Sequence, residues 1–180
     1  MTRVWRRHGT QPIGHFKVFS LRRDELESPR TGGRHDFYVL EAPPWVNVVA
    51  ITEDGQMVLV EQYRHGIGAM TLEIPGGIVD AGESPRETAE RELLEETGYR
   101  AASLSLLGVT HPNPAILDNR LYSFLAAGAR KVAEPSQEAG EDISIVTVPV
   151  AEVPKLVRAG RITHALVLAA LYYLSLPEGG

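Results

Sequence analysis

The spacing of apolar and polar residues changes near Pro43-Pro44, and the chain before that point has the pattern of a small sheet. Residues 13–21 alternate polar and apolar side chains, which predicts a half-buried strand. A polar segment with a Gly-Gly pair, residues 27–33, interrupts this pattern, and residues 35–40 predict a return strand. An antiparallel unit of this size is marginally stable alone. We therefore expect residues 1–42 to form a β-sheet that packs on something else, as a dimerisation or substrate-covering unit.

The rest of the chain, residues 43–180, combines strand patterns with helix patterns. Apolar or alternating runs predict strands, which we place at 45–51, 56–63, 104–110, 121–127 and 143–148. Apolar spacing and end signals predict helices, which we place at 85–97, 151–159 and 166–176. The last helix is apolar on nearly every side, but it is too short to cross a membrane, which takes about 20 residues. We predict one α/β domain, in which this helix begins after a Thr163 cap and is buried across a sheet.

Sharp start and stop signals mark the helix of residues 85–97. Ser84 is a favoured N-cap residue, and Pro85 fits the first helical position because its missing N–H costs nothing there. Glu87 completes a capping box with Ser84. Gly98 suits the left-handed residue just beyond the helix. These signals make this helix the most sharply delimited element of the sequence.

Three glutamates of this helix, Glu92, Glu95 and Glu96, fall within one arc of roughly 100°. Like charges four residues apart cost roughly 0.2–0.5 kcal/mol, and acids near a helix C-terminus also oppose the helix dipole. A divalent cation such as Mg²⁺ would reverse this repulsion, because it binds carboxylate oxygens. Arg91 lies four residues before Glu95 and can hold that carboxylate by a charge-assisted hydrogen bond. The alternative is a solvated, charge-rich surface helix.

The spacing of the fixed residues around the helix favours the cation site. Residues 77–99 match the pattern G-x5-E-x7-R-E-U-x-E-E-x-G-U, where U is an apolar position, at all seven fixed residues. A chance match is on the order of one in 10⁸ per start position. The segment therefore resembles the Nudix box, and the chain resembles the Nudix hydrolases, with Tyr99 standing where an aliphatic residue is more usual. The resemblance implies the Nudix α/β/α sandwich with a mixed sheet.

The resemblance also implies a metal site. The ligands would be the carbonyl oxygen of Gly76 and the carboxylates of Glu92, Glu95 and Glu96, with Mg²⁺, or Mn²⁺ in its place, as the cofactor. A diphosphate linkage is protected from attack by its own negative oxygens. Metal ions roughly 3.5–4 Å apart can bridge the attacking water and a phosphoryl oxygen and lower the pKa of that water.

A second acidic segment is expected to take part in catalysis. Residues 134–142 read as a polar loop, and such loops are usually solvated and mobile. In related enzymes, however, this loop brings a glutamate to the metals as a base or a ligand. Glu141 fits that role best and Glu138 is the second choice, so the candidate catalytic residues are Glu141, Glu138 and Glu95.

Four further positions resemble the substrate-binding residues of the branch that hydrolyses ADP-ribose. Arg64, in Gln-Tyr-Arg, would contact the phosphates, and Glu73, in Leu-Glu-Ile-Pro-Gly-Gly, would help to bind the nucleotide end. Pro114 lies 15 residues after Tyr99, which is the proline position that marks this branch. Ala115 and Asn119 stand where the branch usually has glycine and glutamate, which widens the expected substrates to nucleoside diphosphate sugars.

Aromatic residues are candidates for stacking on the substrate's base. Tyr38, Trp45 and Phe37 lie in predicted strands, where a purely structural role in a core is the more common alternative. Family members of the ADP-ribose branch exchange their N-terminal sheet across a dimer, so the resemblance implies a homodimer. In such a homodimer, the apolar face of the sheet of residues 1–42 would pack against the second copy of the chain.

Composition limits the remaining functions. The formal net charge of −5 provides no broad cationic surface, so we expect no nucleic-acid partner. The chain has no cysteine, which excludes disulfides and thiolate metal sites, and it shows no secretory signal, so we expect a cytoplasmic protein without a membrane partner. We expect hydrolysis of nucleoside diphosphate sugars, ADP-ribose above all, to give AMP and ribose 5-phosphate. The alternatives are a Nudix hydrolase of dinucleoside polyphosphates or CoA derivatives, and a non-catalytic nucleotide-binding regulator.

Overall fold

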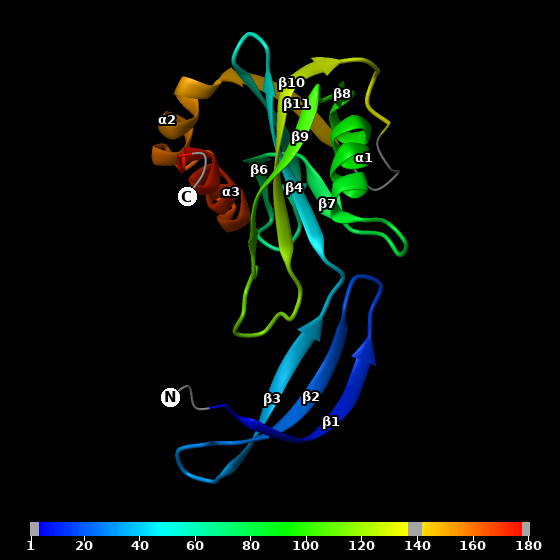
Figure 1. Ribbon diagram of the computed structural model, residues 1–180, viewed down its shortest axis with the longest axis vertical. Coiled ribbons are helices and arrows are strands. Elements are labelled where there is room, and N and C mark those ends of the chain that lie inside the picture. Colours follow the sequence, from blue (N-terminus) through cyan, green and yellow to red (C-terminus); the bar gives the residue numbers. More distant parts are fainter. Residues whose placement is uncertain (1–3, 137–141, 178–180) are drawn as a thin grey trace. The chain divides into compact units, whose positions relative to one another are not determined.

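The protein consists of two compact units. The computed structural model describes residues 4–136 and 142–177. The first unit is built from the chain up to Pro43 together with His111–Arg120, and the second from Pro44–Thr110 together with the chain from Leu121 onward. Each unit has its own sheet (Figure 1). Sequence order alone would not place the segment 111–120 with the N-terminal sheet.

The sheet of the first unit has three antiparallel strands in the order β1-β2-β3. They are β1 (Arg6–His15), β2 (Ser20–Glu27) and β3 (Arg34–Glu41). The strand that we predicted over residues 13–21 is wrong, because a turn closed by a 2.8 Å hydrogen bond from Phe16 N to Phe19 O divides it. The rings of these two residues lie 4.9 Å apart. The aromatic residues thus pack on each other in the turn, so their spacing does not reflect the two faces of a strand.

A buried carboxylate lies inside this small sheet. Asp24 is only 1% exposed, and its oxygens accept hydrogen bonds from Thr10 Oγ1 at 2.8 Å and Arg22 Nε at 3.1 Å. Arg7 Nη2 lies 3.2 Å from the same carboxylate. Burial alone would raise the pKa of Asp24, but the hydrogen bonds from Thr10 and Arg22 outweigh it, so the pKa lies below its ordinary value. Asp24 is therefore ionised and paired with arginines.

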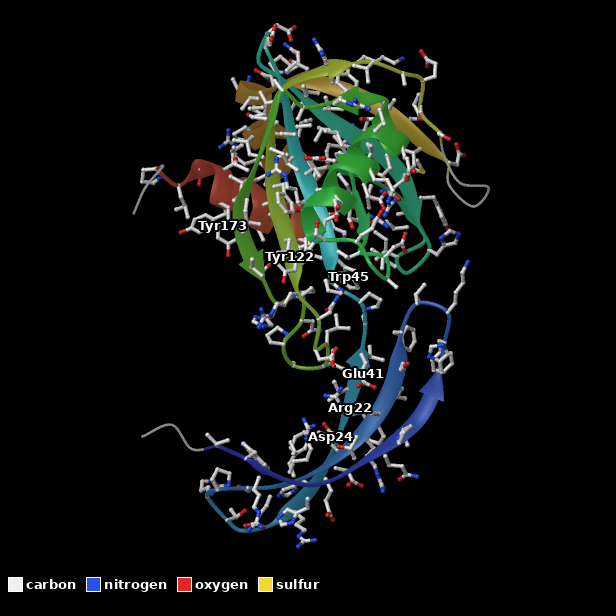
Figure 2. All side chains as sticks on the ribbon, turned by 45° about the vertical axis from the view of Figure 1, so that its right-hand side comes forward. Arg22, Asp24, Glu41, Trp45, Tyr122 and Tyr173 are labelled. Atoms are coloured by element: carbon white, nitrogen blue, oxygen red, sulfur yellow. The ribbon has the colours of Figure 1, made fainter. Side chains whose placement is uncertain are left out.

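Arg22 also ties the segment 111–120 to the sheet. Arg22 Nη1 donates to Glu41 Oε1 at 2.6 Å and to Asp118 Oδ2 at 2.8 Å. Arg22, Asp24 and Glu41 lie together in Figure 2. Leu40 N also donates to Ile116 O at 2.8 Å. The loop that carries Pro114 is thus anchored to β3 by a backbone hydrogen bond and to Arg22 of β2 by a charged side-chain contact.

The second unit is built on a mixed eight-stranded sheet. Its main path is β11-β5-β4-β10-β8, and β6, β7 and β9 pair with β5, β4 and β10 respectively. Strands β10 and β4 run parallel, and the other pairs are antiparallel. The strands are β4 (Trp45–Thr52), β5 (Gln56–Arg64), β6 (Ala69–Glu73), β7 (Gly76–Ile78), β8 (Tyr99–Arg100), β9 (Ser103–Thr110), β10 (Leu121–Lys131) and β11 (Ile143–Pro149).

Helices cover both faces of this sheet. On one face, α1 (Pro85–Thr97) packs its Leu93 in a core cluster with Val48 of β4. On the other face, Val49 lies in a separate cluster with residues of α2 (Val153–Arg158) and α3 (Ala165–Ser175). A short 3₁₀ helix, η1 (Val150–Glu152), leads into α2. Neighbouring residues of β4 therefore face opposite layers, and the predicted α/β/α sandwich with a mixed sheet is confirmed (Figure 1).

The last helix differs from its prediction in two respects. Its N-cap is His164, whose Nδ1 accepts a 3.2 Å hydrogen bond from Leu166 N, so the predicted Thr163 cap is wrong. Within α3 only Val167 and Ala170 are buried, while Tyr172 is 65% exposed. The helix covers the sheet with one face and is not enclosed on all sides. No helix in the described part of the chain is long and apolar enough to span a membrane.

Candidate active site

The helix α1 begins and ends as its sequence signals predict. Ser84 Oγ accepts a hydrogen bond from Glu87 N at 3.3 Å, and Glu87 Oε2 accepts one from Ser84 N at 2.8 Å, which completes the capping box. Gly98 has φ 74° and donates its N–H to Leu94 O at 2.8 Å. The hydrogen bond from Ser84 N lowers the pKa of Glu87. These contacts fix both ends of the helix that carries the acidic cluster.

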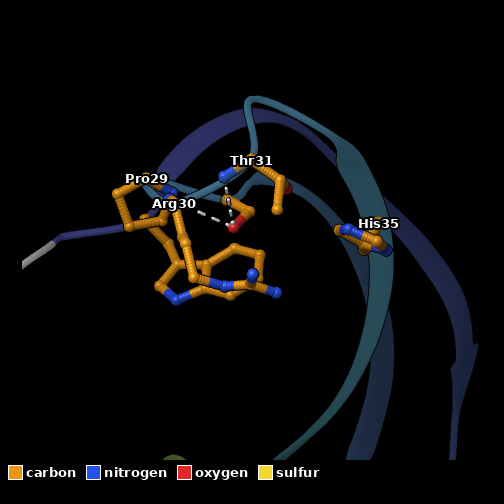
Figure 3. A pocket seen from close by; sticks show the side chains of 6 residues that line it. Pro29, Arg30, Thr31 and His35 are labelled. Atoms are coloured by element: carbon orange, nitrogen blue, oxygen red, sulfur yellow. Dashed lines mark hydrogen bonds between the residues drawn. The ribbon is translucent and has the colours of Figure 1, made fainter.

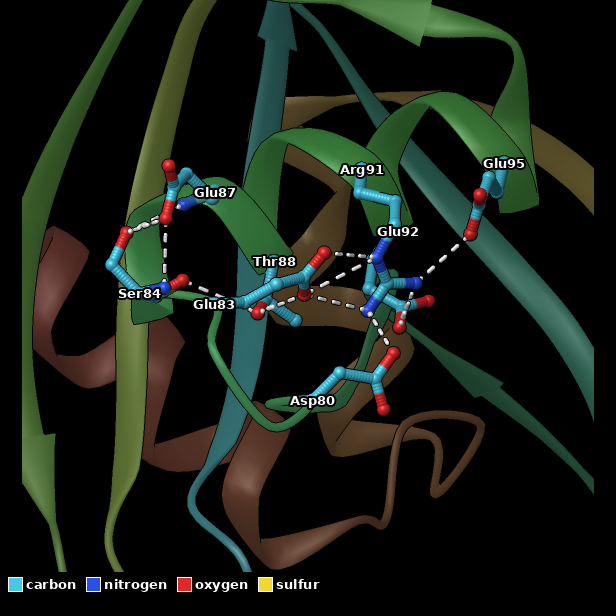
Figure 4. A network of polar contacts seen from close by, with 8 residues as sticks. All are labelled: Asp80, Glu83, Ser84, Glu87, Thr88, Arg91, Glu92 and Glu95. Atoms are coloured by element: carbon cyan, nitrogen blue, oxygen red, sulfur yellow. Dashed lines mark hydrogen bonds and ion pairs between the residues drawn. The ribbon is translucent and has the colours of Figure 1, made fainter.

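Arg91 is the centre of a carboxylate network on this helix (Figure 4). Its Nη1 donates to Glu95 Oε2 at 2.9 Å, as predicted, and also to Glu92 Oε1 at 2.9 Å. Its Nε donates to Glu83 Oε1 at 3.0 Å, and Asp80 lies 3.5 Å from Nη2. The hydrogen bonds to Glu83 raise the pKa of Arg91, and those from Arg91 lower the pKa of Glu83. The Arg91 guanidinium thus holds several acids in one place and balances their charge.

The strand β7 lies against two of the predicted metal-binding side chains, Glu96 and Glu92. Gly76 N donates a 3.0 Å hydrogen bond to Glu96 Oε2, and Glu96 is only 4% exposed. A Cβ atom on Gly77 would lie 2.2 Å from Glu92 Oε1, so this carboxylate occupies the space that the missing side chain leaves. The absence of a side chain at Gly77 is therefore what allows Glu92 to approach the strand.

The donor set suits a hard divalent cation. Glu92, Glu95 and Glu96 come from one helix, Glu96 is bonded to the backbone of Gly76, and carboxylate and carbonyl oxygens are the ligands that Mg²⁺ and Mn²⁺ prefer. Within residues 4–136 and 142–177, no three His, Asp or Glu side chains already stand in a metal-binding arrangement. Here the carboxylates of Glu92 and Glu95 are held by Arg91. The residues fit the ion by their chemistry and by their position next to β7.

Arg64 and Glu73 form a bidentate ion pair beside the box. Arg64 Nε donates to Glu73 Oε1 at 2.8 Å, and Nη2 donates to Oε2 at 2.7 Å. Thr71 Oγ1 donates to Oε1 at 2.6 Å. The hydrogen bonds with Glu73 raise the pKa of Arg64, and the charge of Glu96 adds to this effect. For Glu73, burial acts to raise the pKa, but the hydrogen bonds from Arg64 and Thr71 outweigh it and the pKa is lowered.

The other predicted substrate residues are distributed over both units. Tyr38 is 53% exposed on β3, and Pro114 is exposed in the anchored loop of the first unit. Trp45 is half-buried at the start of β4 in the second unit. Phe37 contacts Trp5, with ring centroids 5.3 Å apart. The predicted catalytic residues Glu138 and Glu141 lie outside the described residues.

Three residues of the site were not assigned to these contacts from the sequence. Glu83 and Asp80 join the network of Arg91, and Thr71 joins the pair of Arg64 and Glu73. Glu83 is a fixed residue of the box, so its position in the motif was a signal for this role. Thr71 gave a weaker signal, because it stands two residues before Glu73 and therefore shares its face of a strand.

A pocket in the first unit is separate from all of these residues (Figure 3). It has a volume of about 410 Å³ and is lined by Trp5, Ser28, Pro29, Arg30, Thr31 and His35. Ser28 Oγ accepts hydrogen bonds from the backbone N–H groups of Arg30 and Thr31 at 3.3 and 3.4 Å. These contacts fix the turn between β2 and β3. None of the predicted site residues lines this pocket.

Comparisons with known proteins agree on one family. The model of the NUDIX domain matches residues 42–171. The ADP-ribose pyrophosphatase of Mycobacterium tuberculosis is 35% identical over 156 residues, which cover 86% of this chain and 75% of that protein. The ADP-ribose pyrophosphatase of Bacillus subtilis is 33% identical over 164 residues, covering 90% of this chain and 88% of that protein. The methanol dehydrogenase activator of Bacillus methanolicus is 31% identical, covering 94% and 91%.

A solved structure resembles most of the chain. The crystal structure of an ADP compounds hydrolase matches with a TM-score of 0.82 at 23% sequence identity, and the match covers 94% of this chain and 91% of that one. At this identity the likeness is one of fold.

Proposed function

The chain belongs to the Nudix family, and from that membership we propose that it hydrolyses the diphosphate bond of nucleoside diphosphate sugars, with ADP-ribose favoured. The products from ADP-ribose would be AMP and ribose 5-phosphate. One observation carries the proposal: all box carboxylates are present, with Glu83, Glu92 and Glu95 bonded to Arg91 and Glu96 bonded to the backbone N–H of Gly76. The two ADP-ribose pyrophosphatases among its relatives support this substrate class.

The chain's own residues supply anchoring, charge and orientation. Arg91 would keep Glu92 and Glu95 in register with β7, and the backbone N–H of Gly76 would do the same for Glu96. A divalent cation held by these carboxylates and the Gly76 carbonyl, Mg²⁺ or Mn²⁺, would offset the charge of the diphosphate and lower the pKa of a bound water. Arg64 would donate hydrogen bonds to a phosphate.

Further roles belong to the same proposal. Glu141, with Glu138 as the second choice, would accept the proton from water or complete the metal site, and Glu95 would support this step. Tyr38 or Trp45 would stack on the base, because their rings are at least partly accessible. Pro114 would shape the substrate site from its anchored loop. We place the enzyme in the cytoplasm, in keeping with a chain that has no cysteine.

We expect the protein to be a homodimer that uses the small sheet. Among the described residues of this unit, the large apolar side chains left exposed are Val4, Trp5, Ile13, Phe16, Val18, Phe37, Tyr38 and Ile116. A second copy of the sheet would remove this surface from water. Light scattering at micromolar concentration should give about twice the chain mass of 19.7 kDa. A mass near that of one chain would refute the dimer.

A panel of substrates tests the activity itself. With Mg²⁺ or Mn²⁺, ADP-ribose should give the highest kcat/KM, followed by other nucleoside diphosphate sugars. Dinucleoside polyphosphates and CoA derivatives serve as the competing substrates. Faster turnover of either competitor would move the chain to another Nudix activity, and no turnover of any compound would favour a nucleotide-binding regulator.

A further inference from the structure

The pair of Arg64 and Glu73 joins an exposed cation to a buried anion. The side chain of Arg64 is 43% exposed, whereas that of Glu73 is only 3% exposed. Both oxygens of Glu73 accept hydrogen bonds from Arg64, at 2.8 and 2.7 Å, in the fork geometry that fixes a guanidinium in its plane. The carboxylate therefore defines where the arginine points.

The position of Glu73 is itself determined by its surroundings. Glu73 Oε1 also accepts a 2.6 Å hydrogen bond from Thr71 Oγ1. Gln62 pairs with Thr71 and Val60 with Glu73 in the β5·β6 ladder, so Arg64, Thr71 and Glu73 share one face of this hairpin. Both oxygens of this carboxylate are engaged by Arg64 or Thr71 and its side chain is only 3% exposed, so little of it is accessible to a ligand.

Arg64, unlike the buried Glu73, still has a hydrogen-bond donor available for a ligand. Its Nε and Nη2 are used by Glu73, while Nη1 makes no hydrogen bond to any residue of the described chain. Glu73, which accepts from this guanidinium, stands just before Gly76 in the chain, and the N–H of Gly76 donates to Glu96 at 3.0 Å, so Arg64 is linked to the acidic cluster through this segment. In keeping with this geometry, the charge of Glu96 helps to raise the pKa of Arg64. An exposed donor next to the proposed metal site is suited to a phosphate oxygen.

We propose that Glu73 is a positioning residue that acts through Arg64 and does not itself touch the nucleotide. Thr71 is the third member of this arrangement. The proposal rests on the proposed function, because the group that Arg64 would contact is a phosphate of the substrate. It assigns Glu73 an effect on phosphate binding, in contrast to the role at the nucleotide end that family resemblance predicts.

A double-mutant cycle with ADP-ribose and Mg²⁺ tests the proposal. Arg64→Ala and Glu73→Gln should each lower kcat/KM, Glu73→Gln by roughly 10–100-fold, because a misplaced group loses about this much. The double variant should be no slower than Arg64→Ala alone, because Glu73 has nothing left to orient. Losses that multiply in the double variant would mean that Glu73 contacts the substrate independently, and the proposal would be overturned.

Two additions keep the outcome decisive. The control variant is Glu61→Gln, which removes a carboxylate of the same hairpin. Glu61 lies 3.3 Å from Arg161, away from Arg64 and Glu73 in the hydrogen-bond network, and its replacement should leave turnover unchanged. If Glu73→Gln fails to fold, Thr71→Val replaces it, with an expected loss of about 2–10-fold that also disappears in the Arg64→Ala background.

A spectroscopic measurement separates this proposal from the proposed function. In ¹⁵N spectra of the free protein, the Nε–H resonance of Arg64 should shift when Glu73 is replaced by glutamine, and an unchanged resonance would overturn the positioning role. A wild-type protein that does not turn over ADP-ribose would instead refute the proposed function, and the resonance would still decide the role of Glu73.

Discussion

Replacing Glu96 by glutamine is expected to remove most turnover with Mg²⁺ while leaving the protein folded. Glu96 is 4% exposed and accepts a hydrogen bond from Gly76 N at 3.0 Å. The amide oxygen of glutamine can accept the same bond, so the link to β7 survives. The negative charge does not, and a hard dication loses one of its carboxylate ligands. We expect kcat to fall by roughly 100-fold or more.

The matched control is Glu90→Gln on the same helix. The side chain of Glu90 is 56% exposed and pairs only with Arg86 among the described residues, at 3.3 Å. Its loss should leave the stability nearly unchanged, because exposed ion pairs contribute little to it. It should also leave kcat unchanged, because Glu90 is not one of the proposed metal ligands. Thermal unfolding of both variants checks that they fold. Turnover of Glu96→Gln close to that of the wild type would refute the assignment of Glu96 to the metal site.

Replacing Gly77 by alanine is expected to reduce activity strongly with little effect on stability. The new Cβ atom would lie 2.2 Å from Glu92 Oε1, which is the mobile end of a long side chain and can move away. The free energy of unfolding should therefore change by less than about 1 kcal/mol. The displaced carboxylate would no longer meet Arg91, whose Nη1 donates to it at 2.9 Å. We expect a loss of roughly 10–100-fold in kcat and a higher Mg²⁺ requirement.

Gly76→Ala, in contrast to Gly77→Ala, is expected to lower the stability of the protein strongly. There the Cβ atom would lie 2.3 Å from the carbonyl oxygen of Val46, which belongs to the backbone of β4 and cannot move alone. We expect the free energy of unfolding to fall by roughly 3 kcal/mol. Gly66→Ala, with open space around its Cβ position, serves as the neutral control. Urea unfolding and Mg²⁺-dependent kinetics measure both effects, and full activity in Gly77→Ala would show that the position of Glu92 does not matter.

The parts of the structure that local chemistry determines were predictable from the sequence. The bounds of α1 follow from Ser84, Pro85, Glu87 and Gly98, since each residue acts within one helical turn of the end that it marks. Strands β4, β5, β9, β10 and β11 follow from apolar or alternating runs in the same way, whereas the short strands β6, β7 and β8 were not predicted. The box spacing then identified the family, because seven fixed residues at fixed distances leave little room for chance.

The parts that depend on distant contacts were not predictable. Asp118 is 96 residues from Arg22, so nothing near either residue indicates that they pair. The turn between Phe16 and Phe19 has the alternation of a strand, and only the packing of the two rings distinguishes it. His164 became the cap of α3 through its imidazole, although Thr163 is the more common residue type for this role.

The candidate site shows the same division. The helical acids and Arg91 were predicted together because they share one face of α1. The pairing of Arg64 with Glu73 was not predicted, because it depends on the register in which β5 meets β6. Sequence resemblance assigned both residues to the substrate, whereas the geometry adds that one holds the other.

The most direct test of the metal site is an anomalous difference map from crystals soaked in Mn²⁺. We predict a peak at coordination distance from the carboxylates of Glu92, Glu95 and Glu96 and from the carbonyl oxygen of Gly76. Arg91 should then remain bonded to Glu83, which it contacts at 3.0 Å in the present arrangement. A map in which these carboxylates face bulk water with no ion beside them would contradict the account.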